Sequence, residues 1–259
     1  MGSQDHVELE AASLDEIRGL GFDPERLAGV KEKILSDIGE EKCHGVSMIA
    51  ARQGKVVLAI TEGYADREND KTLATDSIFV TMSVAKQFTN VLALSLVEKG
   101  LLKLHAPVAE VIPEFATLGK EKVNLYHLLT HTSGLLSAVP AVAPDVLMNI
   151  EKLTSFACGL PLESQPGERV NYSILLGHTV IAAMCLKVAG NGRTYAQMLS
   201  EEIFDPLGMV STSLGPRADL MDRLCPVKVS YKDIPALLPP EAIEGIGSLL
   251  TMPGCEVPG

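Results

Sequence analysis

Ser83 and Lys86 are the two residues of this chain whose types and spacing most directly indicate covalent chemistry. Residues three apart in a helix lie on one face, so a helix through this point brings the Lys86 amine beside the Ser83 hydroxyl. A serine hydroxyl is a weak nucleophile until a neighbouring base takes its proton, and a poorly solvated lysine can be uncharged and do so. The pair could therefore start covalent acyl transfer. Because Ser and Lys are common residues, the same spacing also arises by chance, and the pair needs support from its surroundings.

The segment behind Ser83 has the pattern of a long, buried amphipathic helix that must position this pair. Lys99 and Gly100 close the apolar run, as is typical of a helix C-terminus. A helix that begins at Ser83 would place the hydroxyl among free backbone N–H groups at the positive end of the helix dipole, which favours developing negative charge. The apolar positions are Val84, Phe88, Val91, Leu92, Leu94, Leu96 and Val97.

The segments before Ser83 have the pattern of a helix followed by a small sheet. Residues 21–41 carry a helical apolar pattern that is typical of a surface helix. Two apolar runs, residues 45–51 and 56–60, are separated by a four-residue turn that contains glycine, which predicts a β-hairpin. After a polar loop, residues 77–82 are expected to lead into Ser83 in an extended conformation.

Composition bounds the kind of protein and its partners. The chain has 259 residues, of which 46% are hydrophobic, enough for a sizeable core in one large or two small domains. The net charge of -11, without a basic stripe, argues against nucleic acid and anionic membranes as partners and favours small neutral substrates. No signal sequence and no apolar run long enough to span a bilayer are present, which predicts a soluble, cytoplasmic protein. Five cysteines without C-x-x-C spacing predict reduced thiols, mostly buried.

Two histidines four residues apart raise the question of a metal site. Residues 123–134 predict a short helix that ends at Gly134 and carries His127 and His131. The spacing could present two imidazoles on one face, but no further ligands accompany them at the spacing of a zinc site. Packing or loop anchoring is the favoured interpretation, and we predict neither a metal nor a cofactor.

A tyrosine precedes the next apolar helix. Residues 166–173 form a turn that leads into an apolar helix over residues 174–188, ended by a glycine-rich stretch. Tyr172, at the mouth of this helix, could reach Ser83, although it is one of five tyrosines. Residues 195–207 predict a further helix. Residues 243–250 predict either a strand or the start of a helix.

Several blocks of this sequence, in their order and spacing, together resemble the serine β-lactamase-like family. That family includes class C β-lactamases, the related penicillin-binding proteins, and the family VIII esterases and transesterases. The resemblance runs from about residue 21 to the end of the chain. Its blocks are GYADRE at 63–68, SVAK at 83–86, LVEKGLLKL at 96–104, HLLTHTSGL at 127–135, PGERVNYS at 166–173, IFDPLGM at 203–209 and EGIGSLLT at 244–251.

The resemblance implies roles for three residues. Ser83 is then the acyl-accepting nucleophile, Lys86 the proton acceptor, and Tyr172 the residue that shares proton transfer with Lys86. The implied mechanism is acylation of Ser83, departure of an alcohol or amine, and deacylation by water or another acceptor, with the Ser83 N–H as one oxyanion donor. In the β-lactamases and peptidases the second motif is Tyr-x-Asn, whose Asn holds the substrate amide, but here Ile174 stands at that place. Isoleucine cannot donate a hydrogen bond, so the resemblance favours esters over β-lactams or peptides.

The sequence departs from the family a second time near its C-terminus. Family members carry a third motif, Lys-Thr-Gly or a His/Trp-x-Gly variant, on a later strand, and nothing after Leu250 matches it. That strand normally supplies a second oxyanion donor, and removing one such donor typically costs about 10² to 10³ in turnover. Its absence would leave the hairpin at 45–60 with an unpaired edge. Three alternatives follow. The chain is part of a longer protein, or another chain or a rearranged tail covers this edge, or the protein is weakly active or inactive.

These observations predict an α/β (α+β) β-lactamase-like fold. Residues 1–20 are expected to be a polar tail. An antiparallel sheet part, residues 21–82 and 225–259, is expected to join a mainly helical part, residues 83–224, with a sheet that is incomplete at the C-terminus. The active cleft is expected between the two parts, at Ser83.

The predicted function is a serine hydrolase or acyltransferase acting on a small-molecule ester, with no metal or cofactor. One alternative is a β-lactamase or a hydrolase of the D-peptidase kind, which Ile174 disfavours. The other is a non-catalytic relative with a binding or assembly role, which the missing third motif supports. The joint presence of Ser83, Lys86 and Tyr172 weighs against it. A homo-oligomer that covers the sheet edge is a further expectation.

Overall fold

The computed structural model describes residues 12–138, 142–228 and 240–258 of the chain. The chain divides into two compact units, a sheet unit and a helical unit. The sheet unit comprises residues 1–79 and 222–245, and the helical unit comprises residues 80–221 and 246–259. Residues 246–259 thus belong with the helices, whereas the sequence pattern assigns everything after residue 225 to the sheet.

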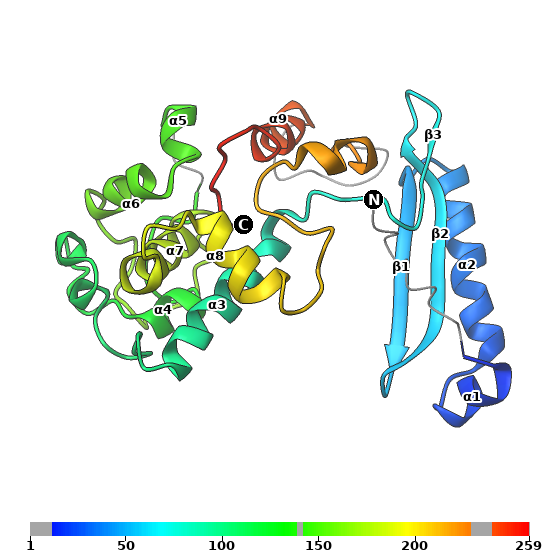
Figure 1. The fold of residues 1–259 in the computed structure, drawn as a ribbon, viewed down its shortest axis with the longest axis horizontal. Coiled ribbons are helices and arrows are strands. Elements are labelled where there is room, and N and C mark those ends of the chain that lie inside the picture. The colour runs from blue at the N-terminus through cyan, green and yellow to red at the C-terminus, as the bar shows by residue number, and fades with distance from the viewer. Residues whose placement is uncertain (1–11, 139–141, 229–239, 259) are drawn as a thin grey trace. The chain divides into compact units, whose positions relative to one another are not determined.

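The sheet unit contains a three-stranded antiparallel sheet in the order β1-β2-β3, with β1 at Gly45–Arg52, β2 at Lys55–Asp66 and β3 at Lys71–Thr72 (Figure 1). The predicted hairpin is present, with a tighter turn than predicted. Only Gln53 and Gly54 connect β1 to β2, and their φ angles are +53° and +76°. Two consecutive positive φ angles are the signature of the two-residue turn whose twist matches that of the strands.

Two helices precede the sheet. The longer helix, α2 at Pro24–Gly39, packs against β2, as Figure 1 shows. It begins where the Asp23 side chain accepts hydrogen bonds from the first free backbone N–H groups and Pro24 supplies a helical φ angle. The shorter helix, α1 at Leu14–Gly19, lies in a segment predicted to be a polar tail. A reciprocal capping box between Ser13 and Glu16 starts α1.

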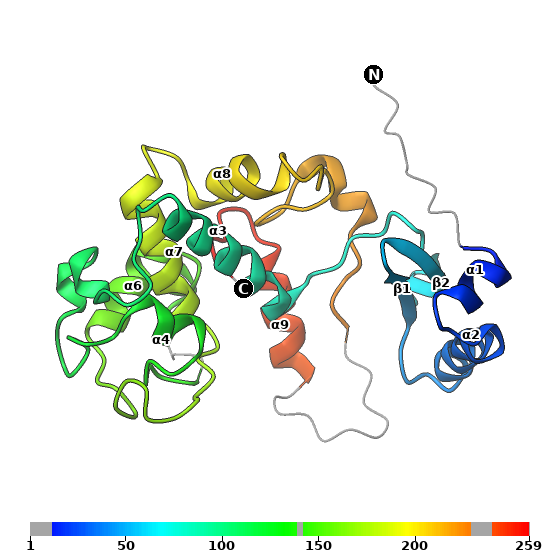
Figure 2. The same ribbon diagram turned by 90° about the horizontal axis from the view of Figure 1, so that it is seen from below.

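The helical unit is built around one buried helix, α7 at Leu176–Ala189 (Figure 2). Most of its side chains are buried all round, which is typical of a core helix, and α3, α4 and α6 pack against it. Leu92, Phe115 and Ile181 are among the core residues with no exposed surface. The other helices are α3 at Lys86–Glu98, α4 at Leu125–Leu129, α5 at Pro144–Leu147, α6 at Ile150–Cys158 and α8 at Tyr195–Leu199, while α9 at Pro240–Leu250 contains the unit boundary.

The last described residues are held against the helical unit by buried polar contacts. The Tyr195 hydroxyl donates to Thr89 Oγ1 at 2.9 Å, and Thr89 in turn donates to the carbonyl of Pro258 at 3.1 Å. Glu256 accepts a hydrogen bond from the backbone N–H of Ile150, in the first turn of α6. These contacts explain why the segment after residue 246 groups with the helices.

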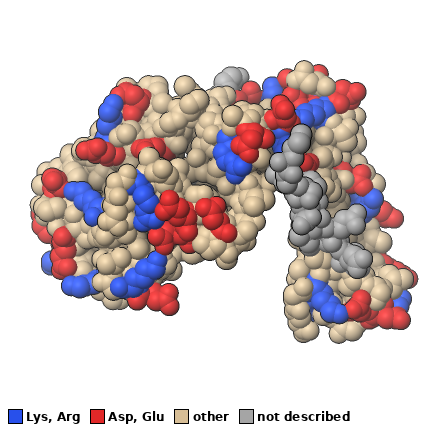
Figure 3. All heavy atoms as spheres, in the orientation of Figure 1, with Lys and Arg blue, Asp and Glu red and all other residues tan. Residues whose placement is uncertain are grey.

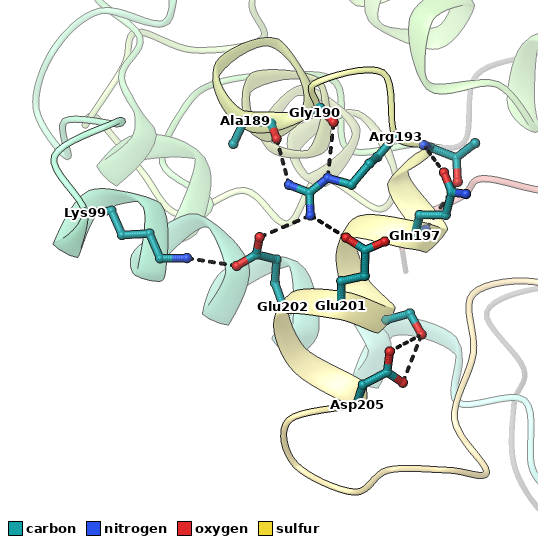
Figure 4. A network of polar contacts seen from close by, with 10 residues as sticks. Lys99, Ala189, Gly190, Arg193, Gln197, Glu201, Glu202 and Asp205 are labelled. Carbon is teal, nitrogen blue, oxygen red and sulfur yellow. Dashed lines mark hydrogen bonds and ion pairs between the residues drawn. The ribbon is translucent and has the colours of Figure 1, made fainter.

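A network of ion pairs joins the C-terminal ends of α3 and α7 (Figure 4). The Arg193 guanidinium donates to the carbonyls of Ala189 and Gly190, which end α7, at 2.8 and 3.2 Å. It also contacts Glu202 at 3.2 Å, and Lys99, at the end of α3, contacts the same carboxylate at 2.8 Å. Exposed ion pairs contribute little individually, but this network satisfies helix-end carbonyls and fixes the end of α3 remote from Ser83.

The surface and the thiols agree with the composition. On the face of the helical unit that Figure 3 shows, Lys and Arg side chains lie among Asp and Glu side chains and form no continuous basic stripe. All five cysteines are free, and three of them are buried. Among the described residues, every helix is too short or too polar to cross a membrane.

Candidate active site

Ser83 and Lys86 are hydrogen-bonded neighbours in the helical unit. The Lys86 Nζ atom donates to Ser83 Oγ at 3.0 Å. Lys86 is buried, with 3% of its surface exposed, while Ser83 is exposed. Ser83 lies in a 3₁₀ turn at Met82–Ala85, and the α-helix begins only at Lys86, three residues later than predicted. The three-residue spacing still brings the two side chains together because the turn and the helix are continuous.

The backbone that leads into Ser83 is strained. Met82 has a φ angle of +47°, a left-handed conformation that is uncommon for residues other than glycine. The first hydrogen bond of the turn runs from the Val84 N–H to the Thr81 carbonyl at 3.0 Å. The Ser83 N–H precedes this bond and has no partner within the turn.

Tyr172 joins the pair from the loop before α7. The Lys86 Nζ atom lies 5.5 Å from the centroid of the Tyr172 ring, and 44% of the Tyr172 surface is exposed. A hydrogen bond between the two side chains also contributes to the electrostatics of Lys86. The structure therefore brings together the three residues that the sequence proposed for the site.

Burial is the main influence on the charge of Lys86. Desolvation lowers the pKa of the Lys86 amine below its usual value, because a charged ammonium loses its hydration in this pocket. The charge interaction and the hydrogen bond with Tyr172 act in the opposite direction and raise this pKa. The balance makes the uncharged amine more accessible than in a solvated lysine, which is the state required to accept a proton from Ser83.

The loop that carries Tyr172 is held by the backbone of residues 131–137. This clamp includes hydrogen bonds from the Asn171 N–H to the His131 carbonyl at 2.7 Å and from the Gly167 N–H to the Thr132 carbonyl at 2.8 Å. The Ser173 hydroxyl, next to Tyr172, donates to the Leu136 carbonyl at 3.0 Å. Tyr172 therefore reaches Lys86 because its neighbours on both sides are fixed to a second loop.

Gly134 does not end a helix, contrary to the prediction from the sequence. The helix α4 ends at Leu129, and Gly134 lies in the clamp with a φ angle of +75°. Its carbonyl accepts from the Glu163 N–H at 2.7 Å, so two backbone segments meet there at close range. A residue without a Cβ atom is required at this approach.

His127 and His131 do not act as a pair. His127 Nδ1 accepts from the Asn124 N–H at the start of α4, at 3.4 Å. The His131 ring instead packs against the ring of Tyr172, with 4.5 Å between centroids. In the part of the chain that the structure describes, no group of three or more His, Cys, Asp or Glu side chains could hold a metal ion.

Two polar residues beside Lys86 were missed by the sequence reasoning. His178, on α7, has no exposed surface, and its Nε2 atom lies 2.9 Å from Asn90 Oδ1. Its ring centroid is 5.3 Å from that of His131. Burial lowers the pKa of His178 to about 3, helped by the nearby charges of Lys86 and His131. The available signal was weak, because each residue is one of several polar residues in its helix, with Asn90 one turn beyond Lys86.

Comparison with known proteins identifies the family of this chain. The Beta-lactamase family model matches residues 30–240, and the chain belongs to that family. The resemblance found in the sequence blocks and the predicted α/β fold class are both confirmed. The family's known members include esterases, penicillin-binding proteins and β-lactamases.

Particular relatives are similar over much of this chain. Esterase EstB of Burkholderia gladioli is 30% identical over 78% of this chain and 55% of its own length. Penicillin-binding protein 4* of Bacillus subtilis (strain 168) is 29% identical over 77% of this chain and 43% of its own length. Among solved structures, EstCE1, described as a hydrolase with promiscuous acyltransferase activity, has a TM-score of 0.67 and 26% identity, covering 83% of this chain and 57% of that one. The chain thus spans about half the length of the curated relatives that it matches.

Proposed function

We propose that the protein is a serine hydrolase or acyltransferase that acts on a small-molecule ester through an acyl-enzyme at Ser83. The observation that carries this proposal is the 3.0 Å contact between Ser83 Oγ and the buried Lys86 amine. An exposed nucleophile beside a desolvated base is the arrangement that covalent acyl transfer requires. Membership of a family with esterases among its members supports the same reaction class.

In the proposed reaction, uncharged Lys86 takes the Ser83 hydroxyl proton as Oγ attacks the ester carbonyl carbon. The carbonyl oxygen becomes an oxyanion that the Ser83 N–H stabilises. As the intermediate collapses, the bond to the alkoxide leaving group breaks, and the proton on Lys86 passes to that oxygen through the Tyr172 hydroxyl. Water or a second alcohol then attacks the acyl-enzyme carbonyl, with Lys86 again accepting the proton. The bond from Ser83 Oγ to the acyl group breaks, the proton on Lys86 returns to Oγ, and the acid or new ester leaves.

Ile174 favours an ester over a β-lactam or peptide. Its side chain offers no hydrogen bond to a substrate amide, while its backbone N–H donates to the Ser137 carbonyl at 3.3 Å. The similarity to EstCE1, a hydrolase with promiscuous acyltransferase activity, supports an acceptor that can be water or an alcohol. Penicillin-binding proteins and β-lactamases are also among the relatives. Amides are therefore the second class of substrate to assay.

Intact-protein mass spectrometry tests the proposal. The wild-type protein and Ser83→Ala are exposed separately to a fluorophosphonate and to a short-chain p-nitrophenyl ester. We expect one adduct on the wild type and none on Ser83→Ala. Ser95→Ala is a matched control, because Ser95 lies on α3 and its hydroxyl donates to the Leu92 carbonyl of its own helix. Equal labelling of wild type and Ser83→Ala, or no labelling of folded wild type, would remove Ser83 from its role.

A further inference from the structure

The polar groups around Lys86 form a closed circuit of contacts. Lys86 and Asn90 lie one turn apart on α3, which places them on the same helix face. Asn90 holds His178 on α7, the His178 ring lies against the His131 ring, and the His131 ring lies against Tyr172. Tyr172 returns to Lys86. The proposed reaction uses only Lys86 and Tyr172 of these five residues.

The Asn90 contact fixes the state of His178. Because Asn90 Oδ1 accepts, His178 Nε2 carries the proton, and a neutral ring then has its lone pair at Nδ1. This Nδ1 atom and that of His131 are buried, and neither has a hydrogen-bond partner within the described protein. These two ring nitrogens therefore make no hydrogen bond in the described residues that would explain their burial.

We propose that His178 and His131, anchored by Asn90, are positioning residues that hold Tyr172 against Lys86 as an uncharged column of rings. The inference rests on the proposed acyl-transfer function. Asn90 fixes the His178 ring to the helix that bears Lys86, and the two imidazoles fill the space between that helix and Tyr172. The half-exposed phenol is thereby supported from its buried side.

The column must be uncharged to serve this purpose. Lys86 on α3 and His131 after α4 are the two titratable groups whose charges act on His178. Both groups are cationic when protonated, so both disfavour a protonated His178. Burial lowers the pKa of His131, and the charge of Lys86 lowers it further. A protonated imidazole in the column would repel the ammonium form of Lys86, because the two positive charges would lie close together with little solvent to screen them. Neutral rings avoid this repulsion and still pack.

Ring-preserving and ring-removing variants separate the possible roles. In His178→Ala the support is lost, and we expect the rate of Ser83 labelling by the fluorophosphonate to fall roughly tenfold to a hundredfold. The matched variant His178→Phe/Asn90→Leu keeps a ring and replaces both hydrogen-bond partners with apolar groups, so its rate is expected to lie between those of wild type and His178→Ala. An acid–base role for His178 predicts instead that both variants lose activity equally, which would overturn the proposal.

The pH dependence of labelling provides a readout that a purely structural role would not move. Labelling requires uncharged Lys86, so its rate rises as pH passes through the pKa of Lys86. Tyr172 raises that pKa, so a displaced Tyr172 shifts the midpoint to lower pH. We expect this shift in His178→Ala and in Tyr172→Phe. We expect no additional shift when His178→Ala is made in the Tyr172→Phe background, because His178 acts through Tyr172.

Failure of the proposed column can be distinguished from failure of the proposed acyl-transfer function. If the wild type is labelled and Ser83→Ala is not, an unshifted midpoint and unchanged rate in His178→Ala overturn the column alone. If the wild type is not labelled, the column is tested by nuclear magnetic resonance of the histidine rings. We then expect His178 as the Nε2–H tautomer, with proximity signals from His131 to both His178 and Tyr172. Absence of these signals in the wild type overturns the column independently of activity.

Discussion

The carbonyl oxygen of Ser164 occupies the place where a side chain on Gly134 would begin. A Cβ atom built on Gly134 would lie 2.1 Å from this oxygen, a distance that real Cβ atoms do not adopt. The oxygen belongs to the backbone, and the position of a Cβ atom is fixed by the backbone, so neither can move aside without shifting one of the two segments. The approach of these two segments is therefore a requirement for the candidate site.

We predict that Gly134→Ala destabilises the helical unit strongly. The substitution combines a left-handed backbone with a backbone clash, so the free energy of unfolding should fall by about 3 kcal/mol or more. Gly192→Ala is the matched control, because Gly192 has a φ angle of +84° but no atom within 4 Å of the added Cβ. Its expected loss is about 1 to 2 kcal/mol, from the backbone alone. Urea unfolding followed by circular dichroism measures both, and equal losses would show that the Ser164 contact is unimportant.

Removing the proposed base should abolish most labelling of Ser83. We expect Lys86→Ala to reduce the rate about 10² to 10⁴-fold, the usual contribution of a positioned general base. Lys99→Ala is the control, because Lys99 follows the same helix but contacts Glu202 at the surface. The wild-type rate should rise with pH to a midpoint below the ordinary lysine value of about 10.5, because burial lowers the pKa of Lys86. Fluorophosphonate labelling across pH measures both effects. Full labelling of Lys86→Ala would assign the base to another group.

Acid should destabilise the helical unit through His178. Its pKa is about 3 in the folded protein, below the ordinary value of 6.5, so the unfolded chain binds more protons between these values. Stability is then fully present above about pH 6.5 and falls as the pH drops toward 3. His178→Phe/Asn90→Leu removes this group, and its urea midpoint should change less between about pH 7 and about pH 5 than that of wild type. His105→Gln, at an exposed histidine, should keep the wild-type slope. An unchanged slope in the double variant would contradict the buried, neutral state of His178.

The sequence predicted those contacts of the site that join residues close together in the chain, and it did not predict those between distant residues. Ser83 and Lys86 are three residues apart, so helical geometry alone brings them together. His178 and Asn90 are 88 residues apart and meet only because α3 packs on α7. Nothing local to either residue indicates its partner. Tyr172 was proposed from the family resemblance, but the clamp by residues 131–137 that fixes it is a backbone contact without a sequence pattern of its own.

The fold could be predicted where the apolar pattern was long. The prediction failed where short polar signals define an element. The helix behind Ser83 and the hairpin at β1 and β2 follow from periodicity and turn residues. The helix α1 has six residues, and its capping box rather than an apolar stripe defines it. The α-helix α3 begins three residues later than the apolar pattern predicts, because Met82–Ala85 form a 3₁₀ turn that the pattern does not distinguish from an α-helix.

The outer edge of β1 leads to a prediction about self-association. In the described residues β1 pairs only with β2, and Ile49 on β1 is 57% exposed. An unpaired strand with exposed apolar side chains is a template for pairing with another chain. We therefore expect the protein to self-associate with concentration, and Ile49→Lys to weaken this association because a charged residue on an edge strand opposes pairing. Leu118→Lys is the matched control, since Leu118 is 55% exposed on the helical unit. Sedimentation velocity over a range of concentrations measures the effect. A monomer at all concentrations, or equal weakening by both variants, would exclude β1 as the associating edge.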